Sequence, residues 1–302
     1  MGTYPYQTKT AEERAEEMKK MQEMLENGIE SAKDSESYKA LLSAAAKFHS
    51  YSVSNMILIY MQNPEATYVA GYKTWQKLGR HIRKGEVGLR IYAPTFKKVT
   101  YNVETVDEKT GDVTIEKKER TFQNFKAVSV FDVSQTDGKD IPGITGITLT
   151  GDVTDYTFLV EALKGCTSAK ITFDEIRGLA KGYYVPGEHS ICVKAGMPEL
   201  QTVKTLAHEI AHSILHKDET GLARGQKELE AESVAFIFCK HFGLDTDSYS
   251  FGYISGWADE NGTDKLRASL DRIQKTAGML IEKTEAFMSG AEDAPEEERK
   301  TA

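Results

Sequence analysis

The stretch "TLAHEIAHSILH", residues 205–216, decides how the C-terminal half of this chain is expected to fold. Its two histidines, His208 and His212, are four residues apart, so in a helix they project from the same face and can bind one cation. Glu209 lies about 100° round the helix, where a carboxylate can hold a metal-bound water without binding the metal. The pattern predicts a zinc-binding helix, although the same spacing occurs in helices with merely solvated histidines. The apolar positions supply a buried side: Leu206, Ile210, Ala211, Ile214 and Leu215.

The expected third zinc ligand comes from the stretch "KELEAESVAFIFCKHFGL", residues 227–244. Catalytic zinc usually takes three protein ligands and a water molecule. The stretch has the apolar period of a second amphipathic helix, and Glu228 and Glu232 share one face near its start. In a glutamate-zincin arrangement one such carboxylate binds the metal and the other orients a histidine. We assign Glu228 as the ligand and Glu232 as the residue behind it. The reverse assignment stays open, as does a simple solvated acidic face.

Two further side chains near the first helix are alternatives. Asp218 lies six residues after His212, as in the metzincin arrangement, but the glycine that turns the chain there is absent. His216 is eight residues after His208, about 12 Å along the helix axis, which is too far to share the ion. We expect the imidazole of His216 to interact with the helix C-terminus, where positive charge is favoured.

The composition is that of a folded chain. Its 302 residues with 40% hydrophobic content are enough for two domains with a core each. No basic and apolar N-terminal leader is evident, and the longest apolar run, "MILIYM" at residues 56–61, is too short to span a bilayer. The three cysteines, Cys166, Cys192 and Cys239, lack metal-type spacing. We therefore expect a reduced, cytoplasmic setting without membrane contact, and Cys239 in the core.

The order of patterns along the chain predicts an α+β fold with two domains. Residues 1–135 read as a helical domain with a small antiparallel sheet, 136–152 as a linker, 153–289 as a zincin-like metallopeptidase domain and 290–302 as a disordered acidic tail. The elements expected in the first domain are helices at 10–33, 36–62 (two helices) and 72–78, and strands at 88–93, 98–106, 112–121 and 124–134, with "DEKTGD" as a hairpin turn. Those expected in the second are a helix at 153–164, a strand at 169–173, a hairpin of "GYYV" and "SICVK", the metal helix, and helices at 226–242 and 263–289. The strand directly before the metal helix would offer a free edge that can hold an extended peptide.

A basic stripe interrupts the otherwise acidic chain. The net charge is −8, but residues 73–98 hold eight basic residues and one acidic residue. Cations that follow a phosphate backbone, interleaved with rings that stack on bases, suit single-stranded DNA. Trp75 within the stripe is either a stacking platform or core, and core is favoured because Tyr72 and Leu78 lie at helical spacing from it. The candidate DNA contacts are Lys73, Lys77, Arg80, Arg83, Lys84 and Arg90.

Two long motifs resemble known families. The stretch "YSVSNMILIYMQNPEATYVAGYKTWQKLGRHIRKGEVGLRIYAP", together with "VSVFDVSQT", closely resembles the N-terminal domain of the ArdC-type antirestriction proteins of plasmids, phages and conjugative elements. That family is associated with single-stranded DNA binding. The two stretches quoted above for the C-terminal half are similar to a zincin-type metallopeptidase domain related to the ImmA/IrrE-like peptidases. The resemblance implies His208, His212 and Glu228 as metal ligands, Glu209 as catalytic base, and the basic stripe as a DNA-binding region.

The sequence therefore predicts a mobile-element antirestriction-like protein that binds single-stranded DNA and carries a Zn²⁺-dependent metallopeptidase domain. Glu209 would accept a proton from water at the metal, and Tyr184 and Tyr253 are the first side chains to test as the donor to the oxyanion, which the sequence does not identify. Two alternatives stay open. One is a dedicated repressor-cleaving metalloprotease of the ImmA/IrrE type, and the other is a DNA-protecting protein whose zinc site is only structural.

Overall fold

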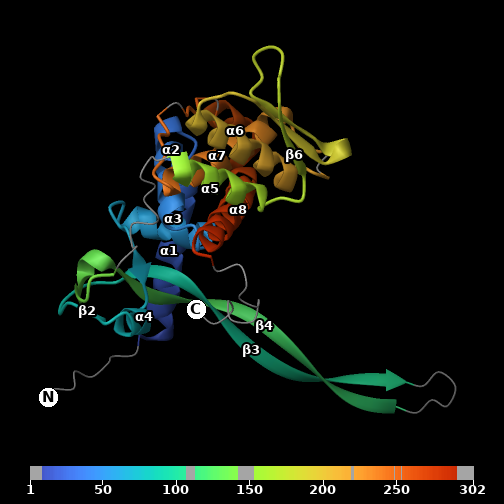
Figure 1. Cartoon of the computed structure of the whole chain (residues 1–302). Helices are drawn as coiled ribbons and strands as arrows, with labels where there is room; N and C mark the ends of the chain where they lie inside the picture. The colour runs from blue at the N-terminus through green and yellow to red at the C-terminus, as the bar shows by residue number, and fades with distance from the viewer. Residues whose placement is uncertain are drawn as a thin grey trace.

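The computed structural model describes residues 9–106, 113–141, 153–218, 221–247, 249–252 and 254–290. Within them, a bundle of long helices carries a small sheet at one end and a long two-stranded arm at the other (Figure 1). The mixed content confirms the predicted α+β class, whereas the zincin-like fold of the C-terminal half stays a prediction. The predicted hairpin turn "DEKTGD", most of the linker at 136–152 and the acidic tail lie outside the described residues. No helix in the described ranges has the length and apolar character to cross a membrane.

Three helices open the chain: α1 (Ala11–Ser31), α2 (Ser35–Lys47) and α3 (Val53–Gln62). Each begins at a side-chain cap, because Thr10, Asp34 and Ser52 accept hydrogen bonds from backbone N–H groups in the first turn. Glu13 completes a capping box with Thr10. The predicted helices at 10–33 and 36–62 are confirmed.

The arm is formed by β3 (Leu89–Val106) and β4 (Val113–Asp132), which pair antiparallel along their whole length. The prediction of four separate strands in this region was wrong. Pro94 breaks the alternating pattern of β3, but it pairs with Phe125 in the continuous register. A proline is tolerated here because β3 is an edge strand in the sheet order β1-β4-β3, where β1 is Val69–Ala70.

A short segment supports the base of the arm. Helix α4 (Tyr72–Lys77) is followed by β2 (Arg80–Ile82), which pairs with β5 (Thr136–Gly138). Trp75 is fully buried, and its indole N–H donates to the Phe131 carbonyl at 3.0 Å. The core interpretation of Trp75 is therefore confirmed. Tyr72, expected on the same apolar stripe, is instead 55% exposed, because α4 has only one side against the arm.

The C-terminal half holds a three-stranded sheet of β6 (Lys170–Asp174), β8 (Ser190–Lys194) and β7 (Gly182–Val185), in that order. The predicted hairpin is confirmed as the antiparallel pair β7 and β8. The strand directly before the metal helix, β8, is paired on both sides, because β6 joins it in parallel. The free edge next to that helix therefore belongs to β7, which corrects the predicted edge.

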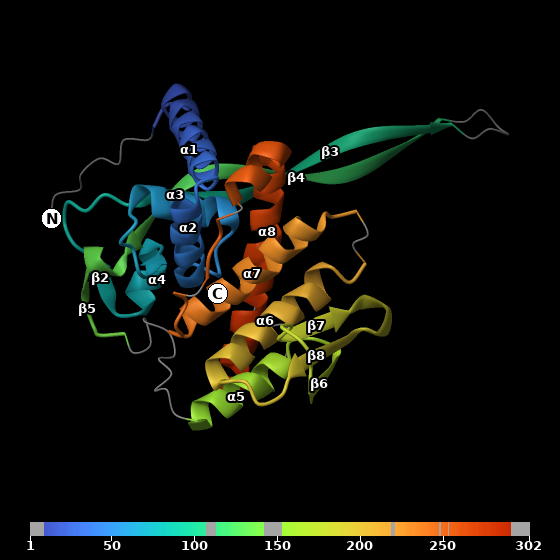
Figure 2. The same ribbon diagram turned by 90° about the horizontal axis from the view of Figure 1, so that it is seen from above.

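Four helices cover the sheet and each other: α5 (Val153–Lys164), α6 (Glu199–Leu215), α7 (Arg224–His241) and α8 (Ile254–Met288). Helix α8 is interrupted at Gly262, whose φ of 79° is left-handed, so the predicted helix at 263–289 is its second segment. Figure 2 shows α8 beside α7, and α2 packs directly against α7.

The two halves share one hydrophobic core. Buried side chains from α1–α3 and from α5–α8 form a continuous cluster that includes Cys239, as predicted. The Tyr38 hydroxyl on α2 lies 2.9 Å from the Ser233 hydroxyl on α7, and Gln274 on α8 donates to the Phe48 carbonyl at 3.0 Å. The division into two domains at 135 and 153 is therefore not shown and stays a prediction.

Candidate metal centre and basic surfaces

Helices α6 and α7 bring together the three predicted ligands. The Nε2 atoms of His208 and His212 lie 3.0 Å apart on α6. A carboxylate oxygen of Glu228 on α7 lies 3.4 Å from His208 Nε2 and 3.7 Å from His212 Nε2. These are the residues with metal-ligand chemistry that converge within the described part of the chain.

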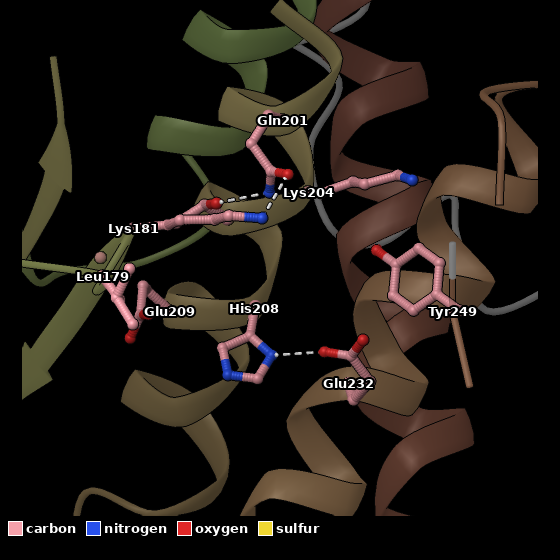
Figure 3. Close-up of a pocket in the computed structure, with 10 residues that line it drawn as sticks. Leu179, Lys181, Gln201, Lys204, His208, Glu209, Glu232 and Tyr249 are labelled. Carbon is pink, nitrogen blue, oxygen red and sulfur yellow. Dashed lines mark hydrogen bonds and ion pairs between the residues drawn. The ribbon is translucent and has the colours of Figure 1, made fainter. Parts of the chain in front are cut away.

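This donor set fits a divalent cation. Atoms bound to one tetrahedral zinc at 2.0–2.1 Å are roughly 3.3 Å apart, inside the observed spread. The outer nitrogens are also held: Nδ1 of His208 lies 3.2 Å from Glu232, and Nδ1 of His212 lies 2.9 Å from Nδ1 of His216. Because acceptors can take the Nδ1–H of each ring, the Nε2 lone pairs are left to face the common centre. Figure 3 shows Glu232 pointing at the ring of His208. The geometry places Glu228 at the centre and Glu232 behind it; their roles toward a metal remain a prediction.

The electrostatics of the centre match these positions. Burial lowers the pKa of His212, so its ring is neutral and can donate a lone pair. Hydrogen bonds from His208 and His212 hold the pKa of Glu228 well below its usual range. Burial opposes the charged form of His208, but Glu228 and Glu232 outweigh it and raise its pKa to about 9. A cation between these groups would take the place of that proton.

Glu209 lies beside the cluster under the edge strand. Burial raises the pKa of its carboxyl to about 7, although the Tyr184 backbone N–H hydrogen-bonds to it. A Cβ on Gly182 of β7 would lie 3.1 Å from Glu209 Cγ and 2.7 Å from Thr205 Cγ2, so only glycine allows this approach. Two cavities of about 390 and 650 Å³ adjoin here and share Gly182, His208 and Glu209. The centre therefore opens to a groove along β7.

Behind His212 lies a buried polar network that the sequence did not predict. The side chain of His216 does not turn to the helix C-terminus, as expected, but contacts Glu230 through Nε2 at 3.2 Å. Glu230 is fully buried on α7 and accepts hydrogen bonds from Arg272, from Ser269 at 2.7 Å and from Gln226 at 3.1 Å. These donors, with that of His216, lower the pKa of Glu230 to about 2 despite its burial. This series of contacts from His212 to Arg272 thus links helix α8 to the metal centre.

The other candidates of this half have different positions. Asp218 is not part of the converging cluster. The Tyr184 hydroxyl lies 2.9 Å from His189 Nδ1, and Tyr184 lines the larger of the two cavities together with His212. Tyr253 is outside the described residues.

The predicted basic stripe divides into two sets. Its arginines are engaged within the protein: Arg80 bonds to Thr136 and the Lys139 carbonyl, Arg83 pairs with Glu86 at 2.9 Å, and Arg90 pairs with Glu17 at 2.7 Å. Its lysines, Lys73, Lys77 and Lys84, are exposed, and in the described ranges they make no hydrogen bond or ion pair. Arg83, a candidate DNA contact, is thus paired with Glu86 three residues later in the "RKGE" turn, whereas Lys84 in the same turn is not.

A second basic surface lies on the arm, and only Lys97 of it belonged to the predicted stripe. In an antiparallel pair of strands, every second pair of opposite residues lies on the same face. Three such pairs in the arm are Lys97 with Phe122, Val99 with Arg120, and Ala93 with Lys126. We call this face the basic arm face: Lys97, Val99, Tyr101, Lys118, Arg120, Phe122 and Lys126. All seven are exposed, and the Arg120 guanidinium lies 5.2 Å from the centroid of the Phe122 ring. In the sequence, the residues of this face recur at every second position. The pattern was missed because separate strands were expected at 88–93 and 98–106, with a break at Pro94.

Comparison with known proteins identifies the N-terminal part. Residues 8–131 match the family described as the N-terminal domain of anti-restriction factor ArdC. The chain therefore has an N-terminal region that matches this family, which confirms the resemblance over these residues. The match does not include the metal centre, so the metallopeptidase assignment of the C-terminal half stays a prediction.

One curated relative and two solved structures are also similar. The uncharacterized protein pXO2-81 of Bacillus anthracis is 28% identical over 313 residues, which covers 91% of this chain and 52% of the relative. The chain thus spans about half the length of that relative. Crystal structures of the antirestriction ArdC protein from the R388 plasmid are 22% identical in the metal-free form (78% of this chain, 85% of that chain, TM-score 0.47) and 21% identical in the Mn(II)-bound form (77% and 84%, TM-score 0.46).

Proposed function

We propose that this protein is an antirestriction protein of a mobile genetic element, with a single-stranded DNA-binding N-terminal half and a metal-dependent peptidase centre in its C-terminal half. The match of residues 8–131 to the anti-restriction family supports the first part. The observation that carries the second is the convergence of His208, His212 and Glu228 beside the buried carboxyl of Glu209.

The residues of the centre have distinct roles in this proposal. Zn²⁺ suits two imidazoles and one carboxylate, and when bound it polarises a peptide carbonyl and acidifies water. Glu209 accepts the proton of that water, because burial raises the pKa of its carboxyl to about 7, near the working pH. Glu232 fixes the ring of His208 through Nδ1. The free edge of β7 binds the extended backbone of the peptide.

The open groove favours a catalytic over a structural metal. Structural zinc usually has four protein ligands, whereas the converging group described here has three. Glu232 is near His208 Nδ1, not near the common centre, so it does not supply a fourth. The remaining position faces the cavities along β7.

Metal analysis and a substrate trap test this half. Chelator-free protein is expected to carry close to one zinc per chain, and His212→Ala to lose it. Glu209→Gln is expected to keep the metal and the fold, abolish peptide cleavage and retain bound substrate in a pull-down. A purified protein without metal, or a Glu209→Gln variant that cleaves as well as the wild type, contradicts the peptidase assignment.

For DNA, the proposal assigns the contact to the basic arm face. Its cations alternate with exposed rings, which suits the backbone and bases of a single strand. The triple variant Lys97→Ala, Arg120→Ala, Lys126→Ala is expected to make the log–log salt slope of binding shallower by roughly 2, at about 0.7 for each phosphate that is no longer neutralised. The matched variant carries Ala at Lys73, Lys77 and Lys84. If only this matched variant changes the slope, the predicted stripe and not the arm binds DNA.

The same titration separates the rival functions. A dedicated repressor-cleaving protease would show no salt-dependent binding of single-stranded DNA. A DNA-protecting protein with a structural zinc would keep its antirestriction activity after Glu209→Gln.

A further inference from the structure

A large cavity at the base of the arm has no role in the peptidase and DNA-binding functions proposed above. It has a volume of about 1020 Å³ and lies between α1, the loop before α3, the first residues of β3, and α8. Figure 2 shows α1, α3 and α8 near the root of β3 and β4, on the side away from the β6-β8-β7 sheet. The cavity is thus separate from the metal centre.

Aromatic rings form one wall of this cavity. Tyr92 and Phe125 make an edge contact with ring centroids 6.5 Å apart, and Phe125 is 55% exposed. The backbone of Tyr92 is fixed by Asn55, whose side chain donates to the Tyr92 carbonyl and accepts from its N–H, both at 2.9 Å. The hydroxyl of Tyr51, a third ring in the wall, donates to the Val69 carbonyl at 2.8 Å. The open face of Phe125 is therefore supported by a rigid frame, as a stacking platform requires.

The charged residues of the lining are all cations. Arg267 on α8 reaches the cavity and donates to the Ser54 hydroxyl at 3.2 Å, and Lys19 lies on α1. No Asp or Glu is among the described residues that line it. Carboxylates act only from outside: Glu23 lies 3.9 Å from Lys19, Glu26 acts on Tyr92, and Asp271 acts on Arg267. The lining is complementary to a flat, aromatic group that carries negative charge.

We infer that this cavity receives one base of single-stranded DNA, stacked on Phe125, with the adjoining phosphate at Arg267. The inference rests on the proposed DNA binding and adds the site at which an unpaired base is held. Charge complementarity and the open ring select this occupant, because an apolar peptide would bring no anion to the cations of the lining and a duplex has no free base face. The cavity would thereby make binding selective for single strands.

Fluorescence anisotropy with a labelled 12-nucleotide thymidine strand, at low salt and on the full chain, tests this site. Phe125→Ala is expected to weaken binding about 5- to 150-fold, the range found when one stacking ring is removed. Arg267→Ala is expected to make the salt slope shallower by about 0.7. Both side chains are exposed enough at their tips for the fold to persist, which the melting temperature of each variant checks. The matched controls are Phe158→Ala on α5 and Arg177→Ala, which lie elsewhere on the surface.

The outcomes separate the two levels of the argument. A wild type that binds the strand, with both cavity variants binding as tightly as their controls, overturns the cavity inference and leaves the proposed DNA binding intact. A wild type that shows no binding at low salt overturns both. Equal binding of the single strand and of a duplex of the same length also overturns the cavity inference, since a paired base cannot enter.

Discussion

Removing the charge of Glu230 should lower both the free energy of unfolding and the affinity of the protein for metal. Glu230 is fully buried, and its pKa is lowered to about 2 by four donors that outweigh its burial. The lowering from 4.5 corresponds to roughly 3 kcal/mol of stability at neutral pH. Glu230→Gln keeps the shape but gives Arg272 and His216 a neutral partner. We expect it to lower the free energy of unfolding by about 3 kcal/mol, similar to other broken buried pairs.

Glu230→Gln should also lower metal affinity, because its effect is transmitted through His216. The ring of His216 stands between Glu230 and Nδ1 of His212, so a weaker hold on His216 loosens the orientation of His212. Loss of such an outer partner typically lowers metal affinity 10- to 100-fold. A competitive chelator titration measures the affinity, and chemical denaturation of the metal-free protein measures the stability. Glu282→Gln, on the exposed side of α8, is the matched control.

The pH dependence has a definite sign. Because the pKa of Glu230 is lower in the folded state, its contribution is complete above pH 4.5 and is lost as the pH falls from about 4.5 toward 2. The difference between wild type and Glu230→Gln should therefore shrink in that window. The reasoning is refuted if Glu230→Gln unfolds and binds metal like Glu282→Gln at pH 7.

Three further perturbations have defined outcomes. Trp75→Ala should lower the free energy of unfolding by roughly 3–5 kcal/mol in denaturant titration, because the ring is fully buried; a loss below 1 kcal/mol would contradict this. Gly278→Ala should destabilise the protein by about 1–3 kcal/mol, because the new Cβ would lie 2.9 Å from the His49 carbonyl oxygen. The control Gly256→Ala should not destabilise it, because nothing lies within 4 Å of that Cβ. Equal melting temperatures of the two variants would disprove the close contact. Burial lowers the pKa of His49, so as the pH falls the unfolded state binds this proton before the folded state does, and the free energy of unfolding should decrease below about pH 6.5. In His49→Asn the decrease of stability with falling pH should be smaller. An unchanged pH dependence would exclude His49 as its cause.

The parts of the fold predicted from the sequence were those set by local patterns. Residues 205–216 and 227–244 form helices α6 and α7, because their apolar positions have the helical period and define the packed sides. The spacing of His208, His212 and Glu228 then sufficed to bring the three together, since two packed helices with facing ligands leave little freedom. Trp75 was placed in the core for the same reason.

The parts that escaped prediction depend on partners far apart in the chain. Glu230 meets Arg272, 42 residues later, and no local pattern marks that pair. Arg90 is neutralised by Glu17 on α1, so not every cation of a basic stretch in the sequence is available at the surface of the fold. The unbroken β3 depends on its position at the sheet edge, which makes Pro94 harmless.

In the proposed function, the arm would also set where a polyanion binds. Residues 136–302 carry 18 Lys and Arg against 28 Asp and Glu, so away from local cations such as Arg267 this half repels phosphate at close range. In salt near 0.15 M this repulsion fades over a Debye length of about 8 Å. Lys97 lies eight residues beyond Leu89 along β3, roughly 26 Å from the root of the arm at about 3.3 Å per residue. A single strand on the outer part of the arm would therefore lie about three screening lengths from the arm's root, where the repulsion between its phosphates and the acidic half of the chain is largely screened.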